Sequence, residues 1–114
     1  MNDQTISVLR QSLAGLAQRQ RALTDNLANL ETPDYLAKRV DFESSLQQAI
    51  SSGDLSRSQI AQSRSSDATG VNGNNVSLDD ETILATDTAL RYQLSVEALN
   101  AKYRLLRTAI RGQG

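Results

Sequence analysis

The sequence contains neither cysteine nor histidine among its 114 residues. Without cysteine it has no disulfide framework and no thiolate nucleophile. Without histidine it lacks the side chain that most often serves as a general base and as a metal ligand. Carboxylates remain available to a hydrolase, but no paired acid and base stands out in the sequence. We therefore predict no catalytic residue, no metal site and no cofactor, and we expect a protein that is not an enzyme.

Aromatic residues and long apolar runs are also scarce. One phenylalanine, three tyrosines and no tryptophan make up 4% of the chain, so a globular core would have few large side chains. No apolar run approaches the ~20 residues of a membrane-spanning helix. The first residues, Met1-Asn2-Asp3-Gln4, lack the basic start and apolar block of a secretory signal. We expect a protein with no transmembrane segment that is cytosolic or leaves the cell without a cleaved signal peptide.

Charge is unevenly distributed along the chain, although the net charge is only −1. Residues 41–90 carry two basic and eight acidic side chains, whereas residues 91–114 carry five basic and one acidic. The basic end holds Lys102, Arg104 and Arg107, together with Arg111. Cations near the C-terminus of a helix complement the helix dipole, which is the simpler explanation. A nucleic-acid-binding patch is the alternative, but it lacks stacking aromatics and a known motif.

The last third of the chain has the pattern of one long helix with two apolar stripes. The first stripe comprises Ile83, Thr86, Leu90, Leu94, Ala98, Ala101, Leu105 and Ala109, and the second comprises Tyr92, Val96, Leu99, Tyr103, Leu106 and Ile110. At about 100° per residue the two stripes lie on roughly opposite sides of the helix. A helix that covers one core needs one stripe. The second stripe therefore indicates a second partner.

We expect one face of this helix to pack on the N-terminal helix of the same chain and the other face on a neighbouring molecule. The residues predicted to form the subunit interface are Leu94, Val96, Leu99, Tyr103, Leu106 and Ile110. The alternative is a small helical bundle that buries both faces inside itself.

The N-terminal region has the heptad spacing of a coiled coil. Its predicted intramolecular seam is formed by Ile6, Leu9, Leu13, Leu16, Leu23, Leu27 and Leu30. These residues follow one another at spacings of three and four, the a and d positions of a heptad, with Gln20 as the one interruption. A buried amide at such a position commonly fixes the register of a coiled coil at some cost in stability.

Turn signals divide the chain into four segments. The only proline, Pro33, should end the first helix, and Asp41 and Gly53 should bound a short second one. We predict an N-terminal coiled-coil helix at 1–31, a turn and short helix at 32–50, a flexible polar linker at 51–76 and a long C-terminal helix at 77–114, with Ser77 as its cap. The predicted fold is all-α and forms one domain, in which the two terminal helices pair antiparallel as a coiled-coil hairpin.

The segment around the proline has a recognisable signature. Asn26, Asn29, Thr32, Pro33 and Tyr35 lie in a stretch that resembles the ANxxTPGY signature near the N-terminus of bacterial flagellar rod and hook proteins. Three further segments resemble the proximal rod proteins of this family: 40–46, 73–81, and the pair 91–93 and 104–110. Asp34 stands where the signature usually has glycine, and it tolerates a left-handed backbone less well than glycine but better than most residues.

The resemblance implies a structural subunit of the proximal rod of the flagellar basal body. Such subunits assemble by helix packing into the drive shaft that transmits torque and that joins the rod to the ring and the export apparatus. The implied partners are other copies of the chain, the rod proteins FlgC and FlgF, the junction protein FliE, the ring protein FliF and the flagellar export apparatus, with no nucleic acid. The implied location is the rod within the periplasm, reached by type III export without a cleaved signal peptide.

Phe42 and Leu46 have two explanations of equal weight. Their spacing resembles the Phe-x-x-x-aliphatic element of early flagellar export substrates, which makes them a candidate export signal. Packing of a short helix against the core explains the same residues. The two explanations are compatible, because export would use the unfolded chain.

Two other functional classes remain open at this stage. A cytosolic coiled-coil adaptor or secretion chaperone would share the long helices, but it would not need four family-like segments in order. Such a protein should be a stably folded species, typically a dimer. A nucleic-acid-binding helical protein would use the basic C-terminal end, and its binding should weaken steeply with salt.

Overall fold

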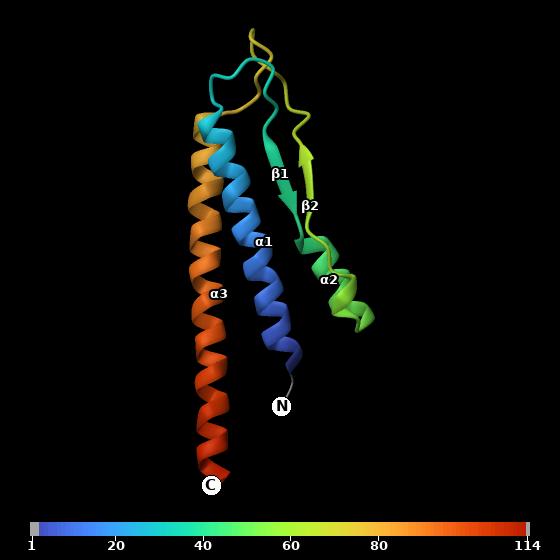
Figure 1. The fold of residues 1–114 in the computed structure, drawn as a ribbon, viewed down its shortest axis with the longest axis vertical. Helices are drawn as coiled ribbons and strands as arrows, with labels where there is room; N and C mark the ends of the chain where they lie inside the picture. The colour runs from blue at the N-terminus through green and yellow to red at the C-terminus, as the bar shows by residue number, and fades with distance from the viewer. Residues whose placement is uncertain (1–2, 114) are drawn as a thin grey trace.

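Two long helices give the molecule its length. In this computed structural model, which describes residues 3–113, helix α1 spans Asp3–Ala28 and helix α3 spans Leu78–Gln113. They run side by side in opposite directions (Figure 1), and the longest extent of the molecule is 67 Å against 27 and 14 Å across it. The radius of gyration of 18.0 Å exceeds the roughly 13 Å of a compact chain of this length. The fold therefore has little interior.

A second layer lies on the side of α1 that faces away from α3 (Figure 1). It consists of strand β1 (Lys38–Asp41), helix α2 (Glu43–Ser52), a short 3₁₀ helix η1 (Leu55–Arg57) and strand β2 (Ala61–Arg64). The strands pair antiparallel, with Lys38 opposite Arg64 and Asp41 opposite Ala61. The mostly helical fold with long terminal helices is confirmed. The prediction of an all-α chain is wrong in that this two-stranded sheet is present.

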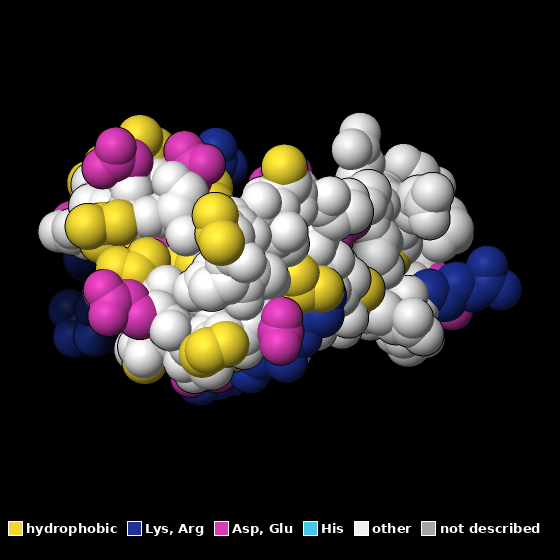
Figure 2. Space-filling view, turned by 90° about the horizontal axis from the view of Figure 1, so that it is seen from above, with side chains coloured by type: hydrophobic (Ala, Val, Ile, Leu, Met, Phe, Trp, Pro, Cys, Tyr) yellow, Lys and Arg dark blue, Asp and Glu magenta, His cyan; other side chains and the backbone are white. Residues whose placement is uncertain are grey.

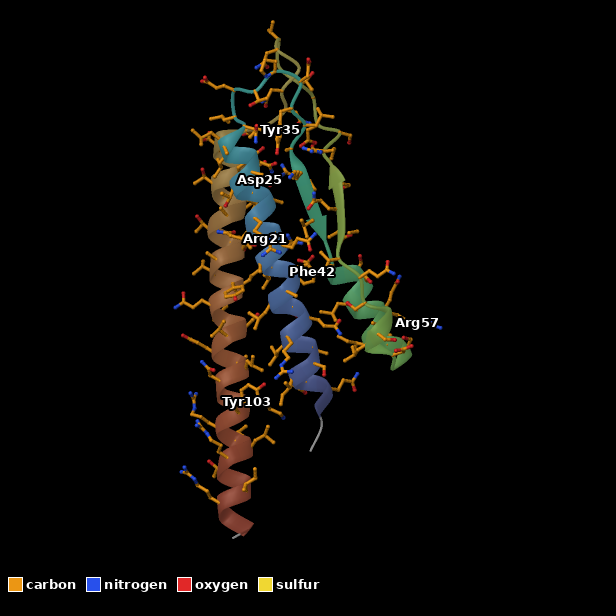
Figure 3. All side chains as sticks on the ribbon, viewed as in Figure 1. Arg21, Asp25, Tyr35, Phe42, Arg57 and Tyr103 are labelled. Atoms are coloured by element: carbon orange, nitrogen blue, oxygen red, sulfur yellow. The ribbon has the colours of Figure 1, made fainter. Side chains whose placement is uncertain are left out.

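The apolar core lies between α1 and this second layer. Its buried members are Leu16, Ala22, Val40, Phe42 and Leu46, and Val8, Leu55 and Ile60 pack around them. Gly15 lies against the Phe42 ring so closely that a Cβ atom there would overlap the ring. The ring can therefore rest directly on the backbone of α1, and Figure 3 shows Phe42 between α1 and the start of α2.

The helix ends predicted from local sequence signals are partly confirmed. Gly53 has a φ of 77° and ends α2, with its N–H directed to the carbonyls of Ala49 and Ile50. At the start of α3, the Asp80 N–H donates to Ser77 Oγ at 3.3 Å, so the Ser77 cap is confirmed. The predicted Asp41 cap is wrong. Phe42 occupies the N-cap position of α2 without a side-chain hydrogen bond, because Asp41 is still the last residue of β1.

The polar segment at 51–76 carries regular structure, namely the end of α2, η1, β2 and a hydrogen-bonded loop. Its flexibility in the free chain stays a prediction. Residues 1, 2 and 114 of the predicted terminal segments lie outside the described residues.

Candidate assembly interface

A buried polar joint connects the end of α1 to the start of α3. The Asn26 side chain, which is 0% exposed, donates from Nδ2 to the Lys38 carbonyl at 3.0 Å and to Glu81 Oε2 at 2.9 Å. Its Oδ1 accepts from the Lys38 N–H at 2.8 Å and from the Tyr35 hydroxyl at 3.3 Å. One amide thus satisfies both the N–H and the C=O of Lys38 in β1 and positions α3.

Glu81 completes this joint. Its side chain is also 0% exposed, and its second oxygen accepts from Arg39 Nη2 at 2.8 Å. A buried carboxylate is costly unless it is paired and hydrogen-bonded. Here Asn26 and Arg39 both donate to it, so the start of α3 is held by directional bonds rather than by apolar packing.

The turns at this end of the molecule are fastened by two consecutive asparagines. Asn74 Nδ2 donates to the carbonyls of Asn29 and Thr32 at 2.9 and 2.8 Å. Asn75 Oδ1 accepts from the Ala37 N–H at 2.7 Å, while its Nδ2 donates to the carbonyl of Ser65 at 3.1 Å. The loop before α3 is therefore bonded to the turn after α1.

Asp34 lies at the tip of this turn with a φ of 61°, the left-handed conformation expected where the family signature has glycine. Its N–H donates to the Asn72 carbonyl at 3.0 Å. Gly73, with a φ of 79°, lies so close to Asp34 that a Cβ atom would overlap the carboxylate. Close contact between the two turns thus requires glycine at 73.

The predicted turn residues are consequently brought together at one end of the molecule. Asn26, Asn29, Thr32 and Tyr35 all take part in this network, and Thr32 Oγ1 also donates to Asn29 Oδ1 at 3.0 Å. Pro33 is exposed at the tip. Figure 3 places Tyr35 where α1 ends and β1 begins.

An ion pair fastens α2 to the middle of α1. Arg19 donates to both Glu43 oxygens, at 2.8 and 2.6 Å, and also to the Val40 carbonyl at 2.7 Å. Its guanidinium lies 5.0 Å from the centroid of the Phe42 ring. The hydrogen bonds from Arg19 lower the pKa of Glu43, and the same bonds raise the pKa of Arg19.

The outward face of α3 is apolar and uncovered within the described chain. Its exposed side chains include Ile83 at 67%, Leu90 at 57%, Leu94 at 66% and Leu105 at 62%. These residues belong to the first of the two apolar stripes. Soluble monomers seldom leave a continuous row of large aliphatic residues in water, and such rows commonly mark contact surfaces.

The second stripe lies partly toward α1. Of the predicted interface residues, Leu94 and Ile110 are exposed, whereas Val96, Leu99, Tyr103 and Leu106 are half-buried. The Tyr103 hydroxyl accepts from Arg10 Nη2 of α1 at 2.7 Å, and Figure 3 shows its ring extending from α3 toward α1.

The predicted seam residues of α1 divide between two neighbours. Leu16 and Leu23 are buried, and the half-buried members are Ile6, Leu9, Leu13, Leu27 and Leu30. Leu16 belongs to the core with Phe42 and also lines a groove between α1 and α3 with Gln20, Thr88 and Tyr92. Gln20 therefore lies beside the groove between the two helices. Its Oε1 is buried without a hydrogen-bond partner among the described residues.

Two kinds of feature are absent from residues 3–113, namely a metal-binding cluster and a membrane-spanning helix. No three acidic side chains there are grouped in a way that could hold a metal ion. Within the same range, every helix is too polar or too short to cross a bilayer.

Comparison with curated proteins identifies relatives over nearly the whole chain. The flagellar basal body rod protein FlgB of Bacillus subtilis is 32% identical over 95% of this chain and 94% of its own length. The proteins of the same name from Cereibacter sphaeroides and Escherichia coli are 31% and 29% identical, over 95% and 90% of this chain and 94% and 89% of their own lengths. The chain belongs to the FlgB family. It is a structural subunit of the flagellar basal body rod. No family model matches the chain.

The polar joint is the part of this FlgB-family chain that sequence reasoning missed. Asn26 was recognised as part of a turn signature, and Glu81 as one of three acids at the start of a helix. Their contact joins positions 55 residues apart, and no local spacing encodes it. A weak signal did exist, because an asparagine on the apolar side of α1 is a polar side chain that needs partners when buried.

Proposed function

We propose that this FlgB-family subunit is built into the proximal rod by packing the outward face of α3 against neighbouring subunits. In that position it transmits torque along the drive shaft and joins the rod to the ring and to the export apparatus. The observation that carries the proposal is the row of exposed aliphatic side chains on α3. Burying one such side chain fully is worth about 1.5–3 kcal/mol, so a row of them supplies substantial association energy.

The predicted interface residues remain part of this proposal. Leu94 and Ile110 are exposed and can meet a neighbour without rearrangement. Val96, Leu99 and Leu106 are half-buried, so each retains area for a second contact. Ile83, Leu90 and Leu105 extend the proposed surface along the helix.

The proposed pairing of α1 with α3 is that of a coiled coil, with Gln20 setting the register. A buried amide in such a seam favours one alignment over others. The seam and the outward face would then bury α3 on two sides, which explains why α3 carries two apolar stripes.

The proposed neighbours are further copies of this chain, the rod proteins FlgC and FlgF, the junction protein FliE and the ring protein FliF. We place the subunit in the part of the rod that crosses the periplasm. We also propose that it passes through the flagellar export apparatus without a cleaved signal peptide.

The candidate export signal fits this route only in an unfolded chain. Phe42 and Leu46 are 4% and 7% exposed, so the fold hides both. Export would therefore use the chain before these side chains enter the core, and the same residues would then stabilise the folded subunit.

The test is complementation of a strain that lacks this gene with variants of α3. Leu94→Asp on the outward face and Ile110→Asp near the end of the helix, both exposed, should each abolish swimming in soft agar, because a charge cannot be buried in an apolar contact. Gln93→Asp, an exposed polar position on the same helix that belongs to neither stripe, is the matched control and should swim normally. Motility with both Asp variants would show that this part of α3 is not an interface.

A second measurement separates a rod subunit from a coiled-coil adaptor. Circular dichroism and sedimentation of the purified chain over a concentration series should show helicity rising as particles form. A fully helical species that is independent of concentration would favour the adaptor, because both stripes would then be satisfied in one closed unit.

A further inference from the structure

The two ends of the long axis carry opposite charge. At the turn end, the segments 29–37 and 65–80 contain no lysine or arginine. We call their exposed carboxylates the acidic head: Glu31, Asp34, Asp67, Asp79 and Asp80. Figure 2 looks down on this end and shows acidic and apolar side chains on its near face, with basic side chains mainly at the margin.

The opposite end is the C-terminal part of α3, where residues 98–113 contain no acidic side chain. Its cations, here called the basic foot, are Lys102, Arg104, Arg107 and Arg111. This part of α3 continues past the start of α1 (Figure 1). The foot thus projects from the molecule, with Leu105 and Ile110 exposed beside the arginines.

Contacts within the chain do not account for these charges. No member of the head or foot takes part in an ion pair among the described residues. The dipole of α3 favours acids in its first turn and cations in its last, but the effect fades within one turn. It explains Asp79, Asp80 and Arg111. It leaves Glu31, Asp34 and Asp67 at the head, and Lys102, Arg104 and Arg107 at the foot, without a role.

We propose that the basic foot of one subunit docks on the acidic head of a second copy. This inference rests on the proposed rod function and gives the assembly a direction. The contact joins two different surfaces, so it leaves a free head and a free foot and continues as an open chain. Apolar side chains exposed at both sites, Ile110 at the foot and Leu78 at the head, would add burial to the charge attraction.

An anionic membrane surface could also attract a basic, partly apolar helix end. The second copy is the occupant that the molecule itself favours, because the same chain carries five carboxylates at one end and four cations at the other. A chain that evolved only to bind an anionic surface has no need of the exposed acidic head.

Charge reversal tests the contact with the full-length chain. A head-reversed variant carries Glu31→Lys and Asp67→Lys, and a foot-reversed variant carries Arg104→Glu and Arg107→Glu. All four side chains are exposed and outside the polar joint. In sedimentation at low salt, we expect each variant alone to associate at least about tenfold more weakly than the unmodified chain, since like charges would face each other. Arg21→Glu with Arg57→Glu is a control of equal charge change and should associate normally.

Restoration is the decisive outcome. An equimolar mixture of the two variants, and a single chain with all four substitutions, should both associate again, because each restores opposite charges at the contact. Failure of both restorations, an equal loss in the control, or no association of the unmodified chain would overturn the proposal. Binding of the chain to phosphatidylglycerol vesicles that is lost in the foot-reversed variant, without association in lipid-free buffer, would overturn it in favour of a lipid surface.

Swimming assays distinguish a failure of the head-to-foot contact from a failure of the proposed rod function. If the foot-reversed variant swims normally while Leu94→Asp, which lies outside the foot, does not, the head-to-foot contact is wrong and the apolar interface stands. If both variants swim normally, the apolar interface fails as well.

Discussion

Helices α1 and α3 differ in what surrounds them. The shorter helix, α1, lies between two layers and buries Leu16, Ala22 and Leu23. Among the described residues of the longer α3, the buried side chains are Glu81 and Thr88, both polar, while large aliphatic residues such as Leu94 and Leu105 are exposed. The apolar content of a helix therefore does not determine its burial. In this chain α1 organises the fold, and α3 leaves much of its apolar surface exposed.

The largest effect should come from removing the ring that packs on α1. Phe42→Ala should lower the free energy of unfolding by about 3–5 kcal/mol, through lost burial and the cavity left behind. The matched change on α3, Leu105→Ala, removes an exposed side chain and should cost less than about 0.5 kcal/mol. Urea unfolding of both variants would check this, and similar losses would mean that α3 is as buried as α1 in solution.

The next largest effect should come from the polar joint. Asn26→Ala leaves Glu81 and the Lys38 backbone groups without their partner, which should cost about 2–3 kcal/mol. Asn100→Ala, at an exposed position on α3, is the control and should be nearly neutral. Thermal unfolding followed by circular dichroism measures both. A neutral Asn26→Ala would show that water replaces the amide at no cost.

A glycine pair sharpens the contrast between the two helices. Gly15→Ala should destabilise the chain by about 1–3 kcal/mol, because the added methyl group meets the Phe42 ring in a packed core. Gly112→Ala meets nothing within 4 Å and should be neutral or stabilising by up to about 1 kcal/mol. Stabilisation by Gly15→Ala, measured by chemical denaturation, would contradict the close ring contact.

The smallest effect should be the pH dependence of the α1–α2 ion pair. Because Arg19 lowers the pKa of Glu43 in the folded state, the pair stabilises the fold above the ordinary glutamate pKa. This stability is lost as the pH falls through the lowered pKa of Glu43 in the folded state. Glu43 is 49% exposed, so solvent screening should limit the effect to about 1 kcal/mol or less.

Glu43→Gln tests this dependence. Between pH 6 and pH 3, which brackets the ordinary glutamate pKa of about 4.3, the unmodified chain should lose more stability than the variant. Gln47→Ala, an exposed position on α2, should leave the pH dependence unchanged. Parallel pH profiles for Glu43→Gln and the unmodified chain would indicate that the pair does not contribute.

The parts of the fold that were predictable are those encoded by nearby residues. The spacing of leucines indicated the long helices, Ser77 indicated the start of α3, and Gly53 indicated the end of the short helix α2. The strands escaped prediction because Lys38–Asp41 and Ala61–Arg64 lack an alternating apolar pattern. Side chains of α1 hold β1 in place, since Asn26 and Arg19 bond to its backbone.

The candidate interface was predictable as a property of α3, but not in its orientation. Two opposite stripes indicate two partners but do not determine which stripe faces α1, and the second stripe, predicted to meet a neighbour, lies partly toward α1. That choice is made by contacts distant in sequence, such as Arg10 with Tyr103 and Asn26 with Glu81. The acidic and basic segments could be recognised in the sequence. Only the fold shows that they lie at opposite ends of the long axis.

The bond between Asn26 and Glu81 holds α1 and α3 together at one end of the helix pair. Farther along the pair, the exposed side chain of Arg10 bonds to Tyr103, and small side chains such as Ala17 and Ala89 line the groove between the two helices. Over the ~39 Å of α1, a splay of about 5° moves the far tip by about 3 Å. We expect such a subunit to fit quasi-equivalent positions through small changes in the angle between α1 and α3, while the polar joint at Asn26 and Glu81 stays intact.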